Sequence, residues 1–329
     1  MKKRGPDLKV SVCKAAEDSF NADSEMFIKG DVAINSTGVV MRDSSKSFTV
    51  VYEELEIGDV IGRGASSVVV HAMHIPTGTP LALKVINMFD KSKRKQLIRE
   101  IETLYNAECP SLVTFYGAFY RQGAITIALE YMEGGALANV VAQMGPIPEA
   151  ALANMTYQIL QALAYMKNQK RVHRDLKPSN LLINGVGQVK LTDFGISAEL
   201  QSSFSMCATF VGTFKYMSPE RIQSKPYSYA SDIWSLGLVL LECATGVYPF
   251  AEEHAAIDMV QTILEAPVPS PDPDRFSPDF CFFIEQCLQK DPSNRLPAEA
   301  LLGSPWMQNH GAIGFEKAIE NVKDWIEHG

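Results

Sequence analysis

Residues 172–180 read VHRDLKPSN, a polar loop that follows a long helical pattern and precedes a short apolar run. The Asp175 carboxylate in this loop can orient a hydroxyl group and take its proton. Lys177 can neutralise charge on a transferring phosphoryl group, and Asn180 can offer an oxygen to Mg²⁺, which prefers hard oxygen ligands. Thirteen residues after Asn180, Asp193 begins the triplet DFG and adds a second carboxylate for the metal. Each group alone fits an ordinary turn, but their order and spacing together indicate phosphoryl transfer.

Two features upstream of this loop extend the pattern. Gly62-Arg63-Gly64 lies in a strand–turn–strand pattern, where glycines let the backbone approach phosphate oxygens, although a simple hairpin turn also explains it. Lys84 lies in the apolar strand LALKVI, where an unpaired ammonium group is costly, so it needs phosphate oxygens or a carboxylate. Glu100 lies between apolar neighbours on the next helical pattern. Glu102 is the competing candidate, because spacing alone does not choose between them.

Polarity and hydrophobic periodicity divide the chain into a polar arm, a β-rich part and a helical part. Residues 1–54 are polar, and weak alternation near Val32–Val40 predicts a mostly flexible arm with one strand. From Leu55 strand-like runs follow one another, with one helical pattern at residues 90–108 between them. Later helical patterns cover residues 148–168, 231–246 and 314–329. The sequence therefore predicts an α+β fold with two lobes, β-rich and then α-rich.

Composition and charge argue against several classes of protein. The net charge of −8 disfavours nucleic acid or an anionic membrane as the main partner, since both need basic surface. No apolar run reaches the roughly 18 residues of a spanning helix. The basic start MKKRGPDLKV lacks the apolar stretch of a secretory signal. The six cysteines form no CxxC pairs, which fits reduced thiols. We therefore expect a cytoplasmic protein, with the nucleus as a second location.

The ordered motifs resemble the signature of the eukaryotic protein kinase family. The resemblance runs from about Leu55 to His310 and includes Ser218-Pro219-Glu220, Asp232 and Arg295. It implies the bilobal kinase fold, with a small β-rich N-lobe at residues 55–131 that contains one key helix, and a larger helical C-lobe at residues 132–310. It also implies that Glu220 and Arg295 form a buried structural ion pair.

The resemblance implies a role for each motif residue. Lys84 would contact the α/β-phosphates of ATP and pair with Glu100, and Asp175 would be the catalytic base. The implied catalytic residues are Lys84, Glu100, Asp175, Lys177 and Thr213, and the implied Mg²⁺ ligands are Asn180 and Asp193. His173 would be a packing residue rather than a proton carrier.

The resemblance also implies a pocket for adenine. Apolar side chains would sandwich the ring, and the backbone of the segment between the lobes would hydrogen-bond to its edge. The apolar residues are Ile61, Val69, Ala82, Leu129 and Leu182, the backbone residues are Glu130 and Met132, and the glycine loop adds Gly62, Arg63 and Gly64. Ser67 stands where many kinases have a third glycine, which leaves the conformation of this loop open.

The ending FVGTxxYMSPER of the segment after Asp193 is similar to MAP kinase kinases, which phosphorylate the threonine and tyrosine of a Thr-x-Tyr motif. Stretches such as RGASSVV and SMCATFVGT are similar to the third group of plant and green-algal members. That group usually carries a further domain after the kinase, and this chain reaches Gly329 without it. The resemblance implies an ATP-dependent dual-specificity kinase. A kinase-fold scaffold without catalysis, the alternative, is disfavoured because the catalytic residues are all present.

The resemblance further implies regulation by phosphorylation and by docking. Ser203 with Thr209 has the plant-type spacing, Ser205 with Thr209 has the animal-type spacing, and we favour the first pair. The basic cluster and apolar pair in Lys2–Val10 resemble a docking peptide for the substrate MAP kinase. The apolar stripe Phe315, Ile319, Val322 and Ile326 predicts a helix at residues 311–329 that docks an upstream MAP kinase kinase kinase, or that only packs on the large lobe.

Overall fold

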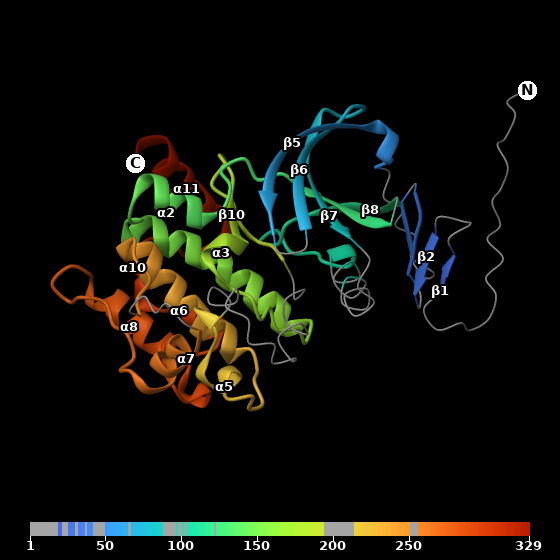
Figure 1. Ribbon diagram of the computed structural model, residues 1–329. Helices are drawn as coiled ribbons and strands as arrows, with labels where there is room; N and C mark the ends of the chain where they lie inside the picture. Colours follow the sequence, from blue (N-terminus) through green and yellow to red (C-terminus); the bar gives the residue numbers. More distant parts are fainter. Residues whose placement is uncertain are drawn as a thin grey trace, which may run out of the picture. The chain divides into compact units, whose positions relative to one another are not determined.

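The computed structural model describes residues 19–21, 26–29, 32–36, 38–41, 50–64, 67–87, 97, 101, 104–121, 123–193, 214–250 and 256–329. The chain forms two compact units, one of Met1–Lys91 with Tyr116–Ala128 and the other of Ser92–Phe115 with Leu129–Gly329. Strands make up the first unit and helices dominate the second (Figure 1). This is the predicted bilobal α+β class.

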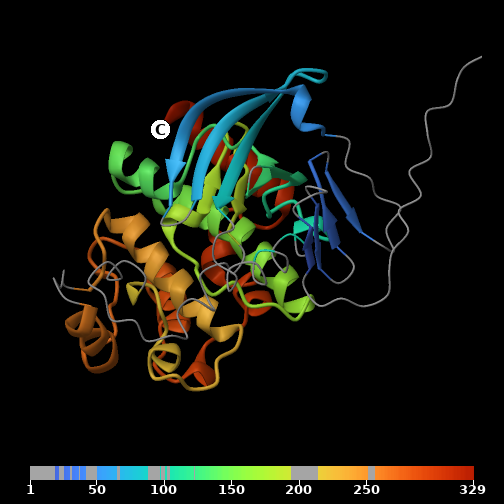
Figure 2. The same cartoon turned by 45° about the vertical axis from the view of Figure 1, so that its right-hand side comes forward.

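The larger sheet of the first unit has the strand order β5-β6-β7-β9-β8. Its strands are β5 Leu55–Arg63, β6 Ser67–His74, β7 Thr79–Asn87, β8 Phe115–Arg121 and β9 Ala124–Glu130. The first three strands pair antiparallel, since short turns join them, and they run side by side as a curved sheet (Figure 2). One face buries a cluster of Val50, Leu55, Ala72, Leu81, Leu83, Phe119 and Ala128.

Four short strands precede this sheet where the sequence predicted one. They are β1 Ser19–Asn21, β2 Met26–Lys29, β3 Val32–Ile34 and β4 Val39–Met41, paired antiparallel in chain order. Strands of three or four residues are too short to give a clear two-residue period, which is why alternation was visible only at β3 and β4. The Tyr120 N–H of β8 donates to the Asn35 carbonyl at 2.9 Å, next to β3. The 3-10 turn Tyr52–Glu54 leads into β5.

The second unit is built around two long helices, α3 Glu149–Asn168 and α6 Ala230–Thr245. Both were predicted, and α6 is buried on nearly all sides because its sequence is apolar nearly all round. It ends at Gly246, whose φ of 79° is the left-handed value that favours glycine. The shorter elements are α2 Leu137–Met144, β10 Leu181–Ile183, β11 Val189–Leu191, α5 Pro219–Ile222, α7 Ala256–Glu265, α8 Pro278–Cys287, α9 Ala298–Leu301 and α10 Pro305–Asn309, with 3-10 turns at Pro178–Asn180 and Pro292–Asn294.

The last helix, α11 Phe315–His328, lies along α3 (Figures 1 and 2). Asn321 Nδ2 donates to Asn154 Oδ1 of α3 at 3.0 Å. Gly187, in the turn between β10 and β11, has a φ of 88°, and a Cβ there would lie 2.2 Å from the Ile319 carbonyl oxygen. Only glycine therefore allows the helix to come so close to this turn.

The buried face of α11 differs from the predicted stripe. Ala318 and Val322 have no exposed surface, whereas Phe315, Ile319 and Ile326 are only partly buried. The helix thus packs on the second unit through a narrow face. The partly exposed residues of the stripe lie beside that face.

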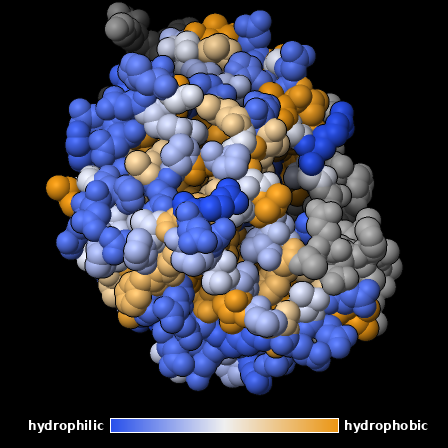
Figure 3. All heavy atoms as spheres, turned by 90° about the vertical axis from the view of Figure 1, so that its left-hand side faces the viewer, coloured by the Kyte–Doolittle hydropathy of each residue, from blue (hydrophilic) through white to orange (hydrophobic). Residues whose placement is uncertain are grey.

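Hydrophilic residues cover most of the face seen in the space-filling view, with hydrophobic patches between them (Figure 3). Exposed large hydrophobic residues include Val247, Phe282 and Ile313. Scattered apolar exposure of this kind is usual on protein surfaces. None of the helices in the described part of the chain has the length and apolar character to cross a bilayer.

Candidate active site

The loop after α3 brings together the side chains of Asp175, Lys177 and Asn180. Lys177 Nζ lies 2.8 Å from Asp175 Oδ2, and Asn180 Nδ2 donates to the same oxygen at 3.0 Å. Asn180 Nδ2 also donates to the Asp175 carbonyl oxygen at 2.7 Å, so one amide group fixes both the backbone and the side chain of Asp175. The amide oxygen of Asn180 is then the atom that can bind a cation.

A buried carboxylate of α6 holds the backbone of this loop. Asp232, 4% exposed, accepts from the backbone N–H of His173 at 2.8 Å and of Arg174 at 2.9 Å, one on each oxygen. Burial raises the pKa of the Asp232 carboxyl group, while these N–H donors favour its charged form. The φ of Arg174 is 74°, and the Arg221 guanidinium donates to the Arg174 carbonyl at 2.6 Å. The loop is therefore held on both sides of a strained residue.

His173 connects the loop to the end of β11. Its Nδ1 accepts from the Asp175 backbone N–H at 3.3 Å, and its Nε2 lies 2.9 Å from the Thr192 carbonyl oxygen. A nitrogen that accepts from an N–H carries no proton, so this pattern places the ring proton on Nε2. The Thr192 N–H donates to the Asn180 carbonyl at 3.0 Å. These bonds tie Asn180 to the residue before Asp193, so the two predicted cation ligands come from adjoining backbone.

Asp193 follows β11 by two residues and is the last described residue before the gap, with a φ of 63°. Its carboxylate and the Asn180 amide oxygen are hard oxygen donors of the type that Mg²⁺ prefers, and Mg²⁺ commonly takes only one or two protein ligands beside substrate phosphates. The donor chemistry of the second unit therefore fits the predicted metal.

The residues predicted to meet the edge of adenine follow β9. The Glu130 N–H already donates to the Thr114 carbonyl at 2.9 Å, so Glu130 can offer adenine only its carbonyl group. The Met132 carbonyl accepts from the Gly135 N–H at 3.0 Å, and Met132 can offer its N–H group. Leu129 is buried and Leu182 is partly buried.

The first unit places the predicted side chains of Val69, Ala82 and Lys84 on one face of its sheet. In the ladder of β5, β6 and β7, Gly62 pairs with Val69, and Val69 pairs with Lys84. Ala82 precedes Lys84 by two residues, so its side chain points the same way. Lys84 is 6% exposed, and Ile61 on the edge strand is 46% exposed.

Gly64 and Ser67 lie close together where the sequence departs from the usual glycine pattern. The Gly64 N–H donates to the Ser67 carbonyl at 2.8 Å. A Cβ at Gly64 would lie 3.0 Å from Ser67 Oγ. The serine therefore occupies space that a side chain at position 64 would need.

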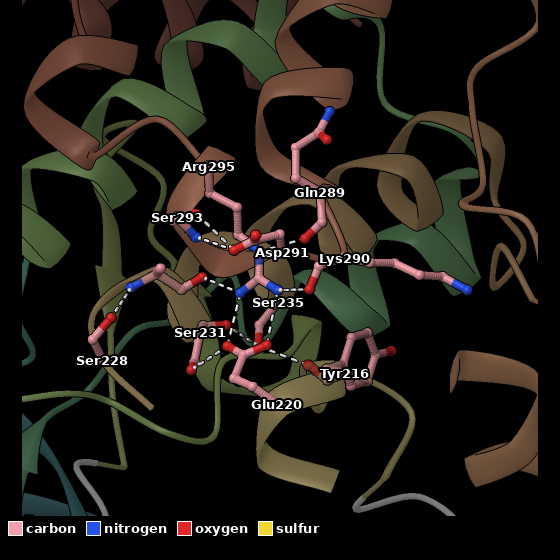
Figure 4. A network of polar contacts seen from close by, with 11 residues as sticks. Tyr216, Glu220, Ser228, Ser231, Ser235, Gln289, Lys290, Asp291, Ser293 and Arg295 are labelled. Carbon is pink, nitrogen blue, oxygen red and sulfur yellow. Dashed lines mark hydrogen bonds and ion pairs between the residues drawn. The ribbon is translucent and has the colours of Figure 1, made fainter. Parts of the chain in front are cut away.

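A polar network surrounds the ion pair predicted between Glu220 and Arg295 (Figure 4). Both guanidinium ends of Arg295 lie 2.8 Å from the carboxylate oxygens of Glu220, and the Ser231 hydroxyl donates to the same carboxylate at 2.8 Å. Although burial opposes it, Arg295 holds the pKa of the Glu220 carboxyl group below its usual value. Arg295 also donates to the Gln289 carbonyl at 2.7 Å, so this network fixes the segment around α5 to the end of α8.

Tyrosines fix the residues just before α5. The Tyr216 hydroxyl donates to Glu242 Oε2 at 2.5 Å, and Ser235 Oγ donates to the Tyr216 carbonyl at 2.7 Å. The Tyr248 hydroxyl donates to the Lys215 carbonyl. Burial raises the pKa of both tyrosines above the usual value, so they remain hydrogen-bond donors.

Several predicted residues lie outside the described residues. They are Glu100, Ser203, Ser205, Thr209, Thr213 and the segment Lys2–Val10. The sequence interpretation also missed a cluster of Thr114, Glu130 and Lys190. The signal was present, because Lys190 lies in the apolar run VKL and a buried lysine needs an anion, the argument already applied to Lys84.

Comparison with known proteins adds an independent finding. The protein kinase domain family matches residues 55–307. The chain is 50% identical over 276 residues to mitogen-activated protein kinase kinase 3 of Arabidopsis thaliana. The aligned region covers 82% of this chain and 53% of that protein. The chain is 43% identical over 323 residues to mitogen-activated protein kinase kinase SIPKK of Nicotiana tabacum, covering 92% and 90%.

A more distant similarity extends to animals. The dual specificity mitogen-activated protein kinase kinase dSOR1 of Drosophila melanogaster is 36% identical over 322 residues, covering 90% of this chain and 81% of that protein. The chain thus spans about half the length of the Arabidopsis relative and most of the length of the other two.

Proposed function

The chain belongs to the MAP kinase kinase family of protein kinases, and from this premise we propose that it transfers the γ-phosphoryl group of ATP to a threonine and a tyrosine of a MAP kinase. The observation that carries this proposal is the geometry around Asp175, where Lys177 and Asn180 orient the carboxylate. The family uses ATP and a divalent metal ion. We assign the metal as Mg²⁺ on the donor chemistry of Asn180 and Asp193.

Each residue of the proposed site acts on charge or position. Asp175 orients the acceptor hydroxyl and takes its proton as the phosphoryl group departs from ADP. Lys177 then moves its charge from Asp175 toward the transferred group, and Thr213 helps to seat the acceptor. By the resemblance, Lys84 would contact the α/β-phosphates and pair with Glu100. Asn180 and Asp193 would hold the metal ion, whose charge would neutralise that of the phosphates.

In the first unit, Ile61, Val69 and Ala82 would offer apolar contacts to adenine. In the second unit, Leu129 and Leu182 would do the same. The Glu130 carbonyl and the Met132 N–H would bond to the adenine edge, and the backbone of Gly62-Arg63-Gly64 would approach the phosphates.

Partners are proposed on the sequence motifs. Lys2–Val10 would attract the substrate MAP kinase through its cations and hold it through Leu8 and Val10, which raises the local concentration of the acceptor. The partly exposed face of α11 would receive the upstream kinase, and phosphorylation of Ser203 and Thr209 would switch the enzyme on.

The test of the proposed function is direct phosphorylation of a panel of catalytically inactive MAP kinases, with the modified residues mapped by mass spectrometry. We expect phosphate on both the threonine and the tyrosine of a Thr-x-Tyr motif in at least one of them. Asp193→Ala is the control and should transfer no phosphate while it unfolds cooperatively. Phosphate on neither residue in any member of the panel would refute the proposal and favour a kinase-fold scaffold that binds partners without catalysis.

A second arm of the same experiment tests docking. Replacing Lys2, Lys3, Leu8 and Val10 by Ala should raise the KM for the intact MAP kinase severalfold and leave ATP hydrolysis without acceptor unchanged. An unaltered KM would remove the docking role from this segment.

A further inference from the structure

The carboxylate of Glu130 is held by three hydrogen-bond donors from two separate segments. Lys190 Nζ lies 2.9 Å from Oε1 and 2.8 Å from Oε2. The Thr114 N–H and its hydroxyl both donate to Oε2, at 3.1 and 2.7 Å. The Lys190 side chain is 7% exposed and that of Glu130 is 19% exposed. This is a shielded ion pair with an added hydroxyl, and such charge-assisted bonds are stronger than exposed ones.

The place of this cluster in the chain is as informative as its contacts. The chain leaves the second unit after Phe115 and re-enters it at Leu129. Thr114 and Glu130 stand next to these two crossings, and the Glu130 N–H donates to the Thr114 carbonyl at 2.9 Å. Within the second unit, the residues next to both crossings therefore belong to one hydrogen-bonded cluster, in which Glu130 contacts both Lys190 and Thr114.

Lys190 also belongs to the strand that leads to the proposed metal ligand. In the β10–β11 pair it lies opposite Leu182, and Asp193 follows three residues later. The Val113 N–H donates to the Leu191 carbonyl at 3.1 Å, so the segment before Thr114 is bonded to the same strand. Movement of Glu130 relative to β11 would have to break the ion pair.

We propose that Lys190 and Thr114 are positioning residues for the nucleotide: they hold Glu130 so that its carbonyl group accepts from the 6-amino group of adenine. The inference rests on the proposed function, because it takes Glu130 as a nucleotide contact. The side chain of Glu130 is bonded to Lys190 and Thr114, so in this proposal it is not itself a nucleotide contact. It acts by fixing the backbone of Glu130, whose N–H on the preceding peptide group is already bonded to the Thr114 carbonyl.

The experiment measures binding of ADP and of the diphosphate of purine riboside, which lacks the 6-amino group, to the full chain. Wild-type protein should bind ADP about tenfold more tightly than the analogue, the worth of one well-placed hydrogen bond. Lys190→Met should weaken ADP binding and reduce this ratio to about twofold. Thr114→Val, which keeps the shape and the backbone N–H, should reduce the ratio by a smaller factor. Lys190→Arg should restore most of it.

A matched control is Lys167→Met, which breaks an exposed ion pair with Glu299 in the same unit and should leave the ratio unchanged. A role in packing alone would lower the midpoint of thermal unfolding and weaken both ligands equally. A wild-type ratio in both Lys190→Met and Thr114→Val would therefore overturn the proposal. Binding is measured without phosphoryl transfer, so the two proposals can fail separately. A protein that binds ADP but phosphorylates no MAP kinase would refute the proposed function, and the affinity ratio would still test the role of Lys190 and Thr114.

Discussion

Arg174 and Asp193 hold backbone conformations that residues with side chains rarely adopt. Their φ values are 74° and 63°, and a left-handed conformation costs roughly 1–2 kcal/mol for such a residue. Strain persists only where neighbouring groups determine the conformation. At Arg174 these groups are the Asp232 carboxylate on the N–H side and the Arg221 guanidinium on the carbonyl side. Because Asp175 is the next residue, the same bonds aim the proposed base.

Asp232→Asn tests this dependence at a single oxygen. The amide would turn an N–H₂ group toward a backbone N–H and leave one buried donor unsatisfied. We expect the free energy of unfolding to fall by about 1–3 kcal/mol, and kcat to fall by at least about tenfold through misplacement of Asp175. Denaturant unfolding and steady-state kinetics measure the two effects. Asp324→Asn, exposed on α11, is the control, and wild-type kcat in Asp232→Asn would show that Asp175 is aimed by other contacts.

Single residues differ in how far the sequence predicts their surroundings. Asp175, Lys177 and Asn180 fall within six residues, so their proximity follows from one short loop. The partners of Lys190 come from positions 114 and 130, and only the folded chain brings them together. From the sequence one could predict that Lys190 needs an anionic partner, but not that this partner is Glu130.

The helix α11 illustrates the same limit for an element. Its amphipathic period predicted a helix, and the helix is present. The period did not choose between the two sides of a wide apolar stripe, and the buried side is set by Ala318 and Val322 where the backbone passes Gly187. A small residue such as Ala318 carries little weight in a hydrophobic pattern, yet it allows the closest approach.

Point changes on α11 separate packing from docking. Val322→Asp would bury a carboxylate and should lower the free energy of unfolding by about 3 kcal/mol or more. Ile319→Ala with Ile326→Ala, on the partly exposed side, should impair activation by the upstream kinase more than the kcat of pre-activated enzyme. Lys317→Asp places the same carboxylate on the exposed face as a control. Equal loss of activation and kcat in the double variant would restrict α11 to packing.

For the whole molecule, a series of strand patterns followed by a series of helix patterns predicted the two units. The prediction succeeded because the two-residue period of strands and the 3.6-residue period of helices are each repeated over many residues. The four N-terminal strands were underpredicted, since each is very short. The segment from residue 194 to 213 lies outside the described residues, and its two flanks are fixed by different means. Asp193 follows a strand bonded to the catalytic loop, and Phe214–Ile222 lead into the network of Glu220 and Arg295.

Phosphorylation within that segment should control the whole enzyme. Acidic replacement of both Ser203 and Thr209 should raise basal activity severalfold, because added negative charge can pair with basic groups and order the segment. Activity toward a MAP kinase, before and after treatment with an upstream kinase, is the measurement. Ser205→Ala is the control and should remain activatable. If Ser205→Ala rather than Ser203→Ala blocks activation, the animal-type pair is the correct one.

The contact between Gly187 and α11 also has a consequence for biosynthesis. The turn at Gly187 emerges from the ribosome long before Ile319, and α3 emerges earlier still. Synthesis runs from the N-terminus to the C-terminus, so residues of α3 can begin to fold before α11 exists. The face of α3 that α11 covers therefore remains open through translation of everything between them. The nascent chain therefore exposes this face of α3, which includes Asn154, to solvent and to chaperones until α11 has been synthesised.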